Sequence, residues 1–291
     1  MTPLLWGAAA LTALLVVIPA ALAWSFSQRM TARRRPDPPT HPTDYGLPYE
    51  EVAFPARDGI PLRGWFIPAA QARGTVVFCH GHAGSMDPDL RYAPWFHQAG
   101  FSVLMFDLRG HGRSGGERVS MGTLEREDLL GAMDYLAGRG IARVGVLGFS
   151  MGGAVALLTA PLDERVAAVA TDGAFVRLEE TLVGWAREAA GLPRWLARPL
   201  ARAVRYATAL RLGVRLQDPI HWIGQLAPRP VLLIHGDCDP YISVEAVEAL
   251  YAAAGEPKEL WRVPQAGHRQ VDQHCPEAYR SRVVGFFEQH L

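Results

Sequence analysis

The stretch that decides the fold lies in the middle of the chain, where residues 144–158 read VGVLGFSMGGAVALL. Its first part is a short apolar run typical of a strand buried on both faces, and its last part is a small-residue helical pattern. Between them, Gly148-Phe149-Ser150-Met151-Gly152 fits the pattern G-x-S-x-G. A sharp strand-to-helix turn brings backbone segments together, so glycines beside the serine relieve clashes that a Cβ would create. The pattern predicts that Ser150 is presented above a sheet as a nucleophile; the alternative is an ordinary glycine-rich turn with an N-cap serine.

Short apolar runs, each followed by a helical pattern, recur along the rest of the chain. Their alternation predicts a parallel sheet with right-handed crossovers. Two alternating stretches around Arg57-Asp58-Gly59 come first and predict an antiparallel hairpin. The predicted strands cover residues 50–54, 62–67, 75–79, 102–106, 143–147, 166–170, 231–234 and 259–263, and the predicted helices cover residues 88–99, 123–137, 151–159, 243–254 and 276–290.

The segment between the sixth and seventh predicted strands is longer than a connecting loop of about 2–6 residues, so it must carry structure of its own. We expect a helical cap at about residues 174–226, over the sheet edge. Part of it has an apolar face opposite an arginine face. The apolar face comprises Leu196, Leu200, Ala203, Val204, Ala207 and Leu210, and the arginine face comprises Arg194, Arg198, Arg202 and Arg205.

A serine hydroxyl is a weak nucleophile until a base removes its proton, so the hypothesis requires a histidine held by a carboxylate. Asp239 and His268 follow the seventh and eighth predicted strands, at the sheet edge where ligands collect in open α/β proteins. The order Ser150, Asp239, His268 is the one expected for this type of sheet. Asp237 is the competing acid, and we favour Asp239 because the acid must be oriented by its loop. Three other histidines beside glycines are predicted to brace loops: His80, His111 and His235.

An acyl-transfer site also needs backbone N–H donors for the oxyanion of the tetrahedral intermediate. Met151, directly after the serine, supplies one. The second is expected from residues 80–85, HGHAGS, which follow the third predicted strand. We assign it to His82, because the neighbouring glycines let the backbone bend so that an N–H points into the site. This chemistry requires no organic cofactor and no metal.

Over nearly all of the chain after Tyr49, these motifs resemble the α/β-hydrolase superfamily, and specifically its bacterial branch of esterases, depalmitoylating thioesterase-like enzymes and S33-type peptidases. The resemblance rests on CHGHAGS, FDLRGHGRSGG, GFSMGG, IHGDCDPYIS and PQAGHRQ. It implies an α/β-hydrolase fold with a mostly parallel central sheet, an N-terminal antiparallel hairpin, helices on both faces and a helical cap between strands 6 and 7.

The resemblance also implies roles for individual residues. Ser150 would be the nucleophile, Asp239 the acid and His268 the base, with the amides of His82 and Met151 forming the oxyanion hole. A serine at position 150 argues against haloalkane dehalogenases and epoxide hydrolases, which need a carboxylate there. His82 departs from the smaller or amide side chains that are frequent in similar loops, which affects the shape of the acyl entrance. The segment with Asp107, Arg109 and Gly110 is expected to brace loops.

The N-terminal segment carries the strongest compositional signal. Residues 2–28 contain no charged side chain, and residues 4–24 provide the roughly 20 apolar positions that a membrane-spanning helix needs. Arg29 and the run Arg33-Arg34-Arg35 follow, and no basic residue precedes. The positive-inside rule then predicts an anchor within residues 1–28 and a cytoplasmic catalytic domain. The alternative is a signal peptide cleaved near Ala23, which would give a secreted or periplasmic protein.

The bulk composition sets further limits. Residues 29–48 are rich in arginine and proline and are predicted to form a stiff, extended linker, followed by a hydrolase domain at residues 49–291. Lys plus Arg and Asp plus Glu number 29 each, so no nucleic-acid partner is expected. The three cysteines are too few for a disulfide framework and contain no C-x-x-C pair.

The predicted reaction is hydrolysis of a small-molecule carboxylic ester or thioester through an acyl-serine. Apolar cap residues and the adjacent membrane segment suggest a lipid-derived acyl substrate as one candidate. A peptidase or acyltransferase would use the same machinery, and a non-catalytic membrane-bound scaffold is the alternative from another class. Acyl length, leaving group and oligomeric state do not follow from the sequence.

Overall fold

The centre of the molecule is an eight-stranded sheet with the order β1-β2-β4-β3-β5-β6-β7-β8. The computed structural model describes residues 16–82 and 84–291. The first strand pairs antiparallel with the second and the second antiparallel with the fourth, while the other neighbours are parallel. The strands are β1 (Glu50–Pro55), β2 (Pro61–Ile67), β3 (Gly74–Cys79), β4 (Phe101–Phe106), β5 (Val144–Phe149), β6 (Val166–Asp172), β7 (Val231–Gly236) and β8 (Lys258–Val263).

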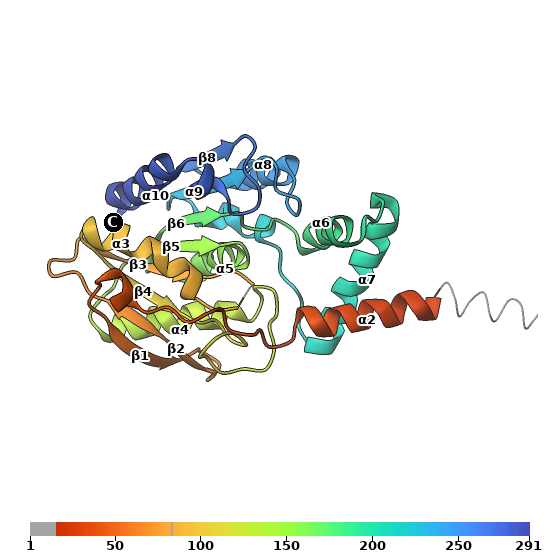
Figure 1. Cartoon of the computed structure of the whole chain (residues 1–291), viewed down its shortest axis with the longest axis horizontal. Coiled ribbons are helices and arrows are strands. Elements are labelled where there is room, and N and C mark those ends of the chain that lie inside the picture. The colour runs from red at the N-terminus through yellow and green to blue at the C-terminus, as the bar shows by residue number, and fades with distance from the viewer. Residues whose placement is uncertain (1–15, 83) are drawn as a thin grey trace, which may run out of the picture.

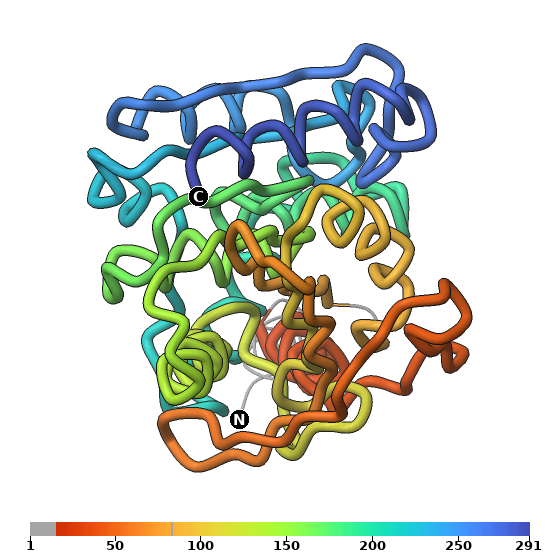
Figure 2. The backbone as a smooth tube through the Cα atoms, turned by 90° about the vertical axis from the view of Figure 1, so that its left-hand side faces the viewer, coloured from red at the N-terminus to blue at the C-terminus, as the bar shows by residue number. Residues whose placement is uncertain are grey.

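Helices cover both faces of this sheet (Figure 1). They are α3 (Ala93–Gln98), α4 (Glu125–Gly138), α5 (Met151–Thr159), α8 (Val244–Ala253), α9 (Val271–His274) and α10 (Pro276–His290). Alternate side chains of a strand point to opposite faces. Accordingly Val77 of β3 joins the core formed with α4, α5 and α8, whereas Val76 joins the core formed with α3 and α10. The predicted α/β-hydrolase fold is confirmed, and Figure 2 shows the β1–β2 hairpin at one end of the molecule and the blue C-terminal part of the chain at the other.

The cap consists of α6 (Leu178–Ala190) and α7 (Arg194–Leu212), between β6 and β7 as predicted. It lies beyond the carboxyl ends of the parallel strands, together with the N-terminal helix α2 (Ile18–Met30), which packs against α7 (Figure 1). The apolar face expected on α7 coincides only in part with the face that is buried. Leu196 is 42% exposed and Leu210 is 62% exposed. The buried positions of α7 are Ala197, Ala201, Val204, Ala207 and Thr208.

The buried face of α7 consists mainly of small and hydroxyl side chains, because these let α6 and α2 approach the helix closely. Thr208 Oγ1 donates a hydrogen bond to Ser27 Oγ at 2.9 Å. The Arg211 guanidinium donates to Ser27 Oγ at 2.9 Å and to Thr31 Oγ1 at 3.0 Å. An assignment based on large apolar side chains alone misses a helix contact built in this way.

The arginine- and proline-rich segment at residues 29–48 is extended in part, but it is not a spacer free of the domain. The Arg33 guanidinium donates hydrogen bonds to the carbonyl oxygens of Gly112, Ser114 and Gly116 at 2.7–2.9 Å. Further along, Asp37 Oδ2 accepts a hydrogen bond from the Ser85 backbone N–H at 2.8 Å. These hydrogen bonds attach residues 33–37 to the rest of the molecule, and the division into a linker at residues 29–48 and a hydrolase domain at residues 49–291 stays a prediction.

The membrane prediction depends mainly on residues 1–15, which lie outside the described residues. Among residues 16–82 and 84–291, no helix combines the length and apolar character that a bilayer crossing requires. The anchor, its orientation and the alternative cleavage near Ala23 therefore stay predictions from the sequence.

Candidate active site

Ser150 occupies the turn between β5 and α5 with φ of +50° and ψ of −114°, a conformation that few non-glycine residues adopt. The neighbouring glycines make this turn possible. A Cβ added to Gly148 would lie 2.5 Å from the carbonyl oxygen of Gly152, and one added to Gly152 would lie 2.0 Å from the carbonyl oxygen of Cys79. The G-x-S-x-G spacing therefore follows from close backbone packing, which holds Ser150 at the carboxyl end of the central strand.

Gly152→Ala is expected to destabilise the fold by about 1–3 kcal/mol or more, since the new methyl group must displace backbone atoms. Chemical denaturation monitored by circular dichroism measures this change. The matched control is Gly285→Ala in the middle of α10, where an added Cβ meets nothing within 4 Å. That variant should be stabilised by about 0.5–1 kcal/mol, because alanine is the better helix residue. A Gly152→Ala protein as stable as the wild type would contradict the close packing.

A chain of hydrogen bonds joins Ser150 to two side chains that are distant in the sequence. His268 Nε2 lies 2.9 Å from Ser150 Oγ, and His268 Nδ1 lies 2.6 Å from Asp239 Oδ2. Because an ionised carboxylate can only accept, Nδ1 carries the proton and Nε2 presents its lone pair to the serine hydroxyl. The other oxygen of Asp239 accepts from the backbone N–H groups of Tyr241 and Ile242 at 2.8 and 3.0 Å. The structure brings the three predicted side chains together.

The competing carboxylate, Asp237, has a different partner. Its two oxygens accept hydrogen bonds from the Arg262 guanidinium at 2.9 and 3.0 Å. The Arg262 hydrogen bond holds the pKa of Asp237 below its ordinary value. Asp237 therefore forms an ion pair with Arg262 at the ends of two strands. The Asp239 side chain, only 1% exposed, instead faces His268.

The predicted oxyanion donors lie beside Ser150. Gly81, His82, Ser150 and Met151 line one pocket of about 300 Å³. Met151 is the first residue of α5, so its N–H has no acceptor within the helix and is free to bind a substrate oxygen. A Cβ added to Gly81 would lie 3.4 Å from the Ser150 Cβ, which shows how closely this loop approaches the nucleophile.

The His82 side chain is held by the N-terminal helix. Its Nε2 donates a hydrogen bond to the carbonyl oxygen of Met30 at 2.8 Å, and its ring centroid lies 5.8 Å from that of Trp185 in the cap. Desolvation lowers the pKa of His82 to about 4, so the ring is neutral at pH 7. The unusual side chain at this position thus links the oxyanion loop to α2 and α6.

Four of the residues expected to brace loops do so. The Arg109 guanidinium donates hydrogen bonds to Asp58 and Asp128, and the ring nitrogens of His111 lie 2.8 and 3.3 Å from the carbonyl oxygens of Arg109 and His82. His80 Nε2 accepts a hydrogen bond from the Leu108 N–H at 2.9 Å. Asp107 accepts hydrogen bonds from the Met86 and Arg113 N–H groups at 2.8 and 2.7 Å. His80 and Asp107 shape the loops around the serine without contacting it.

Sequence reasoning missed part of the pocket lining. Met121 and Phe175 line the pocket from loops without a recognisable motif, and Arg269 lines it directly after His268. Arg269 has φ of +54° and forms an ion pair with Asp89 at 2.6 Å. Its position next to the predicted base was the one available signal. Within the described part of the chain, no group of three or more histidine, cysteine or acidic residues is arranged to hold a metal ion.

Comparison with known proteins places the chain in a family. The model described as serine aminopeptidase, S33, matches residues 70–221, which is more than half of the chain and includes the Ser150 turn. The chain belongs to this α/β-hydrolase family. It is similar to the uncharacterised proteins YqkD of Bacillus subtilis strain 168 (31% identity over 82% of this chain and 80% of the relative) and YfhR of Escherichia coli strain K12 (30% identity over 81% of this chain and 80% of the relative). Among solved structures, the Pyrococcus furiosus esterase Pf2001 has a TM-score of 0.77 at 27% identity, covering 90% of this chain and 98% of the other.

Proposed function

We propose that this α/β-hydrolase cleaves a carboxylic ester or thioester through an acyl-serine intermediate. The observation that carries the proposal is the hydrogen-bonded series from Ser150 Oγ through His268 to Asp239. Serine, imidazole and carboxylate in this arrangement are the requirement for nucleophilic catalysis by a hydroxyl group. The structural similarity to the Pyrococcus furiosus esterase Pf2001 supports the same reaction.

In the first half-reaction, Ser150 Oγ attacks the carbonyl carbon while His268 Nε2 takes the hydroxyl proton. The carbonyl oxygen becomes an oxyanion that the N–H groups of His82 and Met151 stabilise. The intermediate then collapses, the bond to the alcohol or thiol breaks, and His268 returns the proton to the leaving group. Throughout, Asp239 stabilises the imidazolium.

In the second half-reaction, water attacks the acyl-serine and His268 takes a proton from it. A second tetrahedral intermediate releases the carboxylic acid, and the proton returns to Ser150 Oγ. Each proton lost by a nucleophile is thus returned to a leaving oxygen or sulfur, so no further reactant is consumed. An acceptor other than water would give an acyltransferase on the same residues.

Peptidase activity is the second candidate, favoured by the description of the matching family as serine aminopeptidase. A panel of matched substrates separates the two: 4-nitrophenyl esters, thioesters and aminoacyl 4-nitroanilides. We expect kcat/KM to be highest for esters or thioesters. Higher values for the aminoacyl anilides would replace the ester assignment by a peptidase, and a folded protein inert toward all three classes would favour a scaffold.

A further inference from the structure

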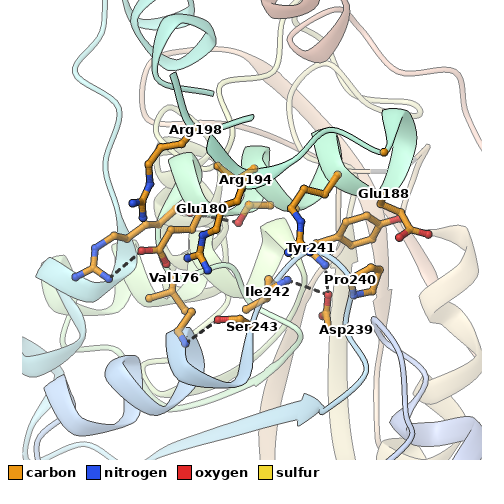
Figure 3. A pocket seen from close by; sticks show the side chains of 17 residues that line it. Val176, Glu180, Glu188, Arg194, Arg198, Asp239, Pro240, Tyr241, Ile242 and Ser243 are labelled. Atoms are coloured by element: carbon orange, nitrogen blue, oxygen red, sulfur yellow. Dashed lines mark hydrogen bonds and ion pairs between the residues drawn. The ribbon is translucent and has the colours of Figure 1, made fainter. Parts of the chain in front are cut away.

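A second pocket, of about 500 Å³, lies directly beside the one that contains Ser150. Its lining comes from α6, the beginning of α7, the loop 239–243 and the first turn of α8 (Figure 3). The two pockets share Thr181, Tyr241 and Ile242, so these residues form the wall between them and the second pocket lies next to the one at Ser150. We call it the arginine pocket because Arg177, Arg187, Arg194 and Arg198 line it.

Three of these four arginines form no ion pair within the part of the chain that the structure describes. Arg177 lies 3.8 Å from Glu180, but no ion pair within 4.0 Å joins Arg187, Arg194 or Arg198 to a described carboxylate. Arg194 extends from the cap toward the loop that carries Asp239 (Figure 3).

Three other carboxylates lie in or near the arginine pocket. Both oxygens of Asp239 are already occupied, by His268 and by backbone N–H groups. Glu188 lines the pocket and is exposed. Glu245, in the first turn of α8, is exposed. Its pKa is lowered mainly by hydrogen bonds to its own backbone and to Ser243, and Arg194 contributes less. The pocket lining therefore holds four arginines and three carboxylates, and Arg187, Arg194 and Arg198 form no ion pair with any of these carboxylates.

Guanidinium groups that converge without carboxylate partners repel one another, and a bound anion relieves this repulsion. The planar fork of donors matches carboxylate and phosphate oxygens, which can accept two hydrogen bonds from one arginine. These arginines come from two helices and line one pocket, unlike the side chains of a single solvated helix face.

Close packing fixes the position of helix α6, which carries Arg187, relative to the loop that carries Asp239. Gly184 of α6 lies so near the acid loop that an added Cβ would be 2.6 Å from Tyr241 Cα and 2.9 Å from the Pro240 carbonyl oxygen. The same loop carries Asp239, which holds His268. The cap helix and the loop thus contact each other without intervening side chains.

We propose that the arginine pocket binds an anionic group of the substrate, a carboxylate or a phosphate, while the scissile carbonyl lies at Ser150. This inference rests on the proposed function and narrows it to acyl esters or thioesters that carry a negative charge away from the bond that is cleaved. A neutral ester would leave the arginines unpaired and gain nothing from them.

Matched pairs of chromogenic esters test the proposal. Two esters carry the negative charge on the acyl side: mono-4-nitrophenyl adipate and the 4-nitrophenyl ester of 6-(phosphonooxy)hexanoic acid. A third, 3-carboxy-4-nitrophenyl hexanoate, carries it on the leaving group. All three are compared with the neutral ester 4-nitrophenyl hexanoate. At least one anionic ester should exceed its neutral partner in kcat/KM by about tenfold or more, as expected for charge-assisted hydrogen bonds. The double variant Arg194→Gln/Arg198→Gln should lose this preference.

Arg202→Gln is the matched control. This arginine lies on the same helix, pairs with Glu179 at 3.1 Å and lines neither pocket, so the preference should persist in that variant. Wild-type protein that hydrolyses all the esters without preferring any anionic one would overturn the proposal. A preference that survives in the double variant would do the same.

A binding measurement separates failure of this proposal from failure of the proposed function. Isothermal titration of adipate and of inorganic phosphate into full-length protein needs no turnover. If no ester is hydrolysed, the proposed function fails, yet binding that is weakened in the double variant and kept in Arg202→Gln still supports an anion site. If neither anion binds and no anionic ester is preferred, the arginine pocket is not an anion site.

Discussion

Ser150→Ala is expected to lower kcat for the best ester by roughly 10⁴- to 10⁶-fold, the range found when a serine nucleophile is removed. The substitution deletes the only atom that His268 Nε2 contacts in the described site, Ser150 Oγ at 2.9 Å, and leaves the oxyanion donors and pockets in place. The residual rate then reflects binding and oxyanion stabilisation alone. Stopped-flow and steady-state assays on matched protein concentrations measure the loss.

Stability and specificity controls accompany this variant. Ser281→Ala, on the exposed side of α10, should keep wild-type kcat and the wild-type melting temperature. Ser150→Ala should also unfold close to the wild-type temperature, because the hydroxyl makes no core contact. A folded Ser150→Ala protein with more than about a tenth of the wild-type kcat would exclude Ser150 as the nucleophile.

Asp239→Asn and Asp237→Asn are expected to differ sharply in activity. An asparagine at position 239 can donate to His268 Nδ1, which places the imidazole proton on Nε2 and removes the lone pair that accepts the serine proton; kcat should fall by about 10⁴-fold. Asparagine at position 237 loses only a partly exposed ion pair with Arg262, so kcat should stay within a few-fold of wild type. The measurement is kcat for one ester across the pH range, with unfolding curves for both variants. Equal losses at the two positions would leave Asp239 without support as the orienting acid.

The sheet was predictable because its strands carry their own signal. The runs at β3, β4, β5, β6 and β7 are apolar and buried throughout or nearly so, which reflects helices on both faces. The glycines on either side of Ser150 predicted the turn there, because a Cβ added to Gly148 or Gly152 would meet backbone atoms. At these positions the local sequence pattern favours the same structure as the packing of the whole domain, so the pattern was enough to predict the structure.

The cap and the N-terminal region were less predictable because partners far apart in the chain decide their packing. On α7, Thr208 is buried because Ser27 lies against it, whereas Leu210 remains 62% exposed. Arg33 binds carbonyl groups of residues 112–116, about 80 positions away. Neither helical periodicity nor proline content indicates such contacts.

In the candidate site, too, some features could be predicted from the sequence and others could not. Ser150, Asp239 and His268 follow strands whose carboxyl ends share one sheet edge, so their meeting could be predicted from topology. The arginine pocket could not, because it needs the position of α6 relative to the loop 239–243. An arginine-rich helix face is, from sequence alone, indistinguishable from a solvated one.

The most direct test of the central claim is covalent labelling of the full-length protein with a fluorophosphonate, followed by peptide mass spectrometry. An activated serine displaces fluoride and retains the phosphonyl group on its oxygen. We expect one equivalent of adduct, located on the peptide that contains Ser150, with esterase activity lost in proportion. An enzyme that hydrolyses esters but carries the adduct on another residue, or remains unlabelled at Ser150 while losing activity, would contradict it.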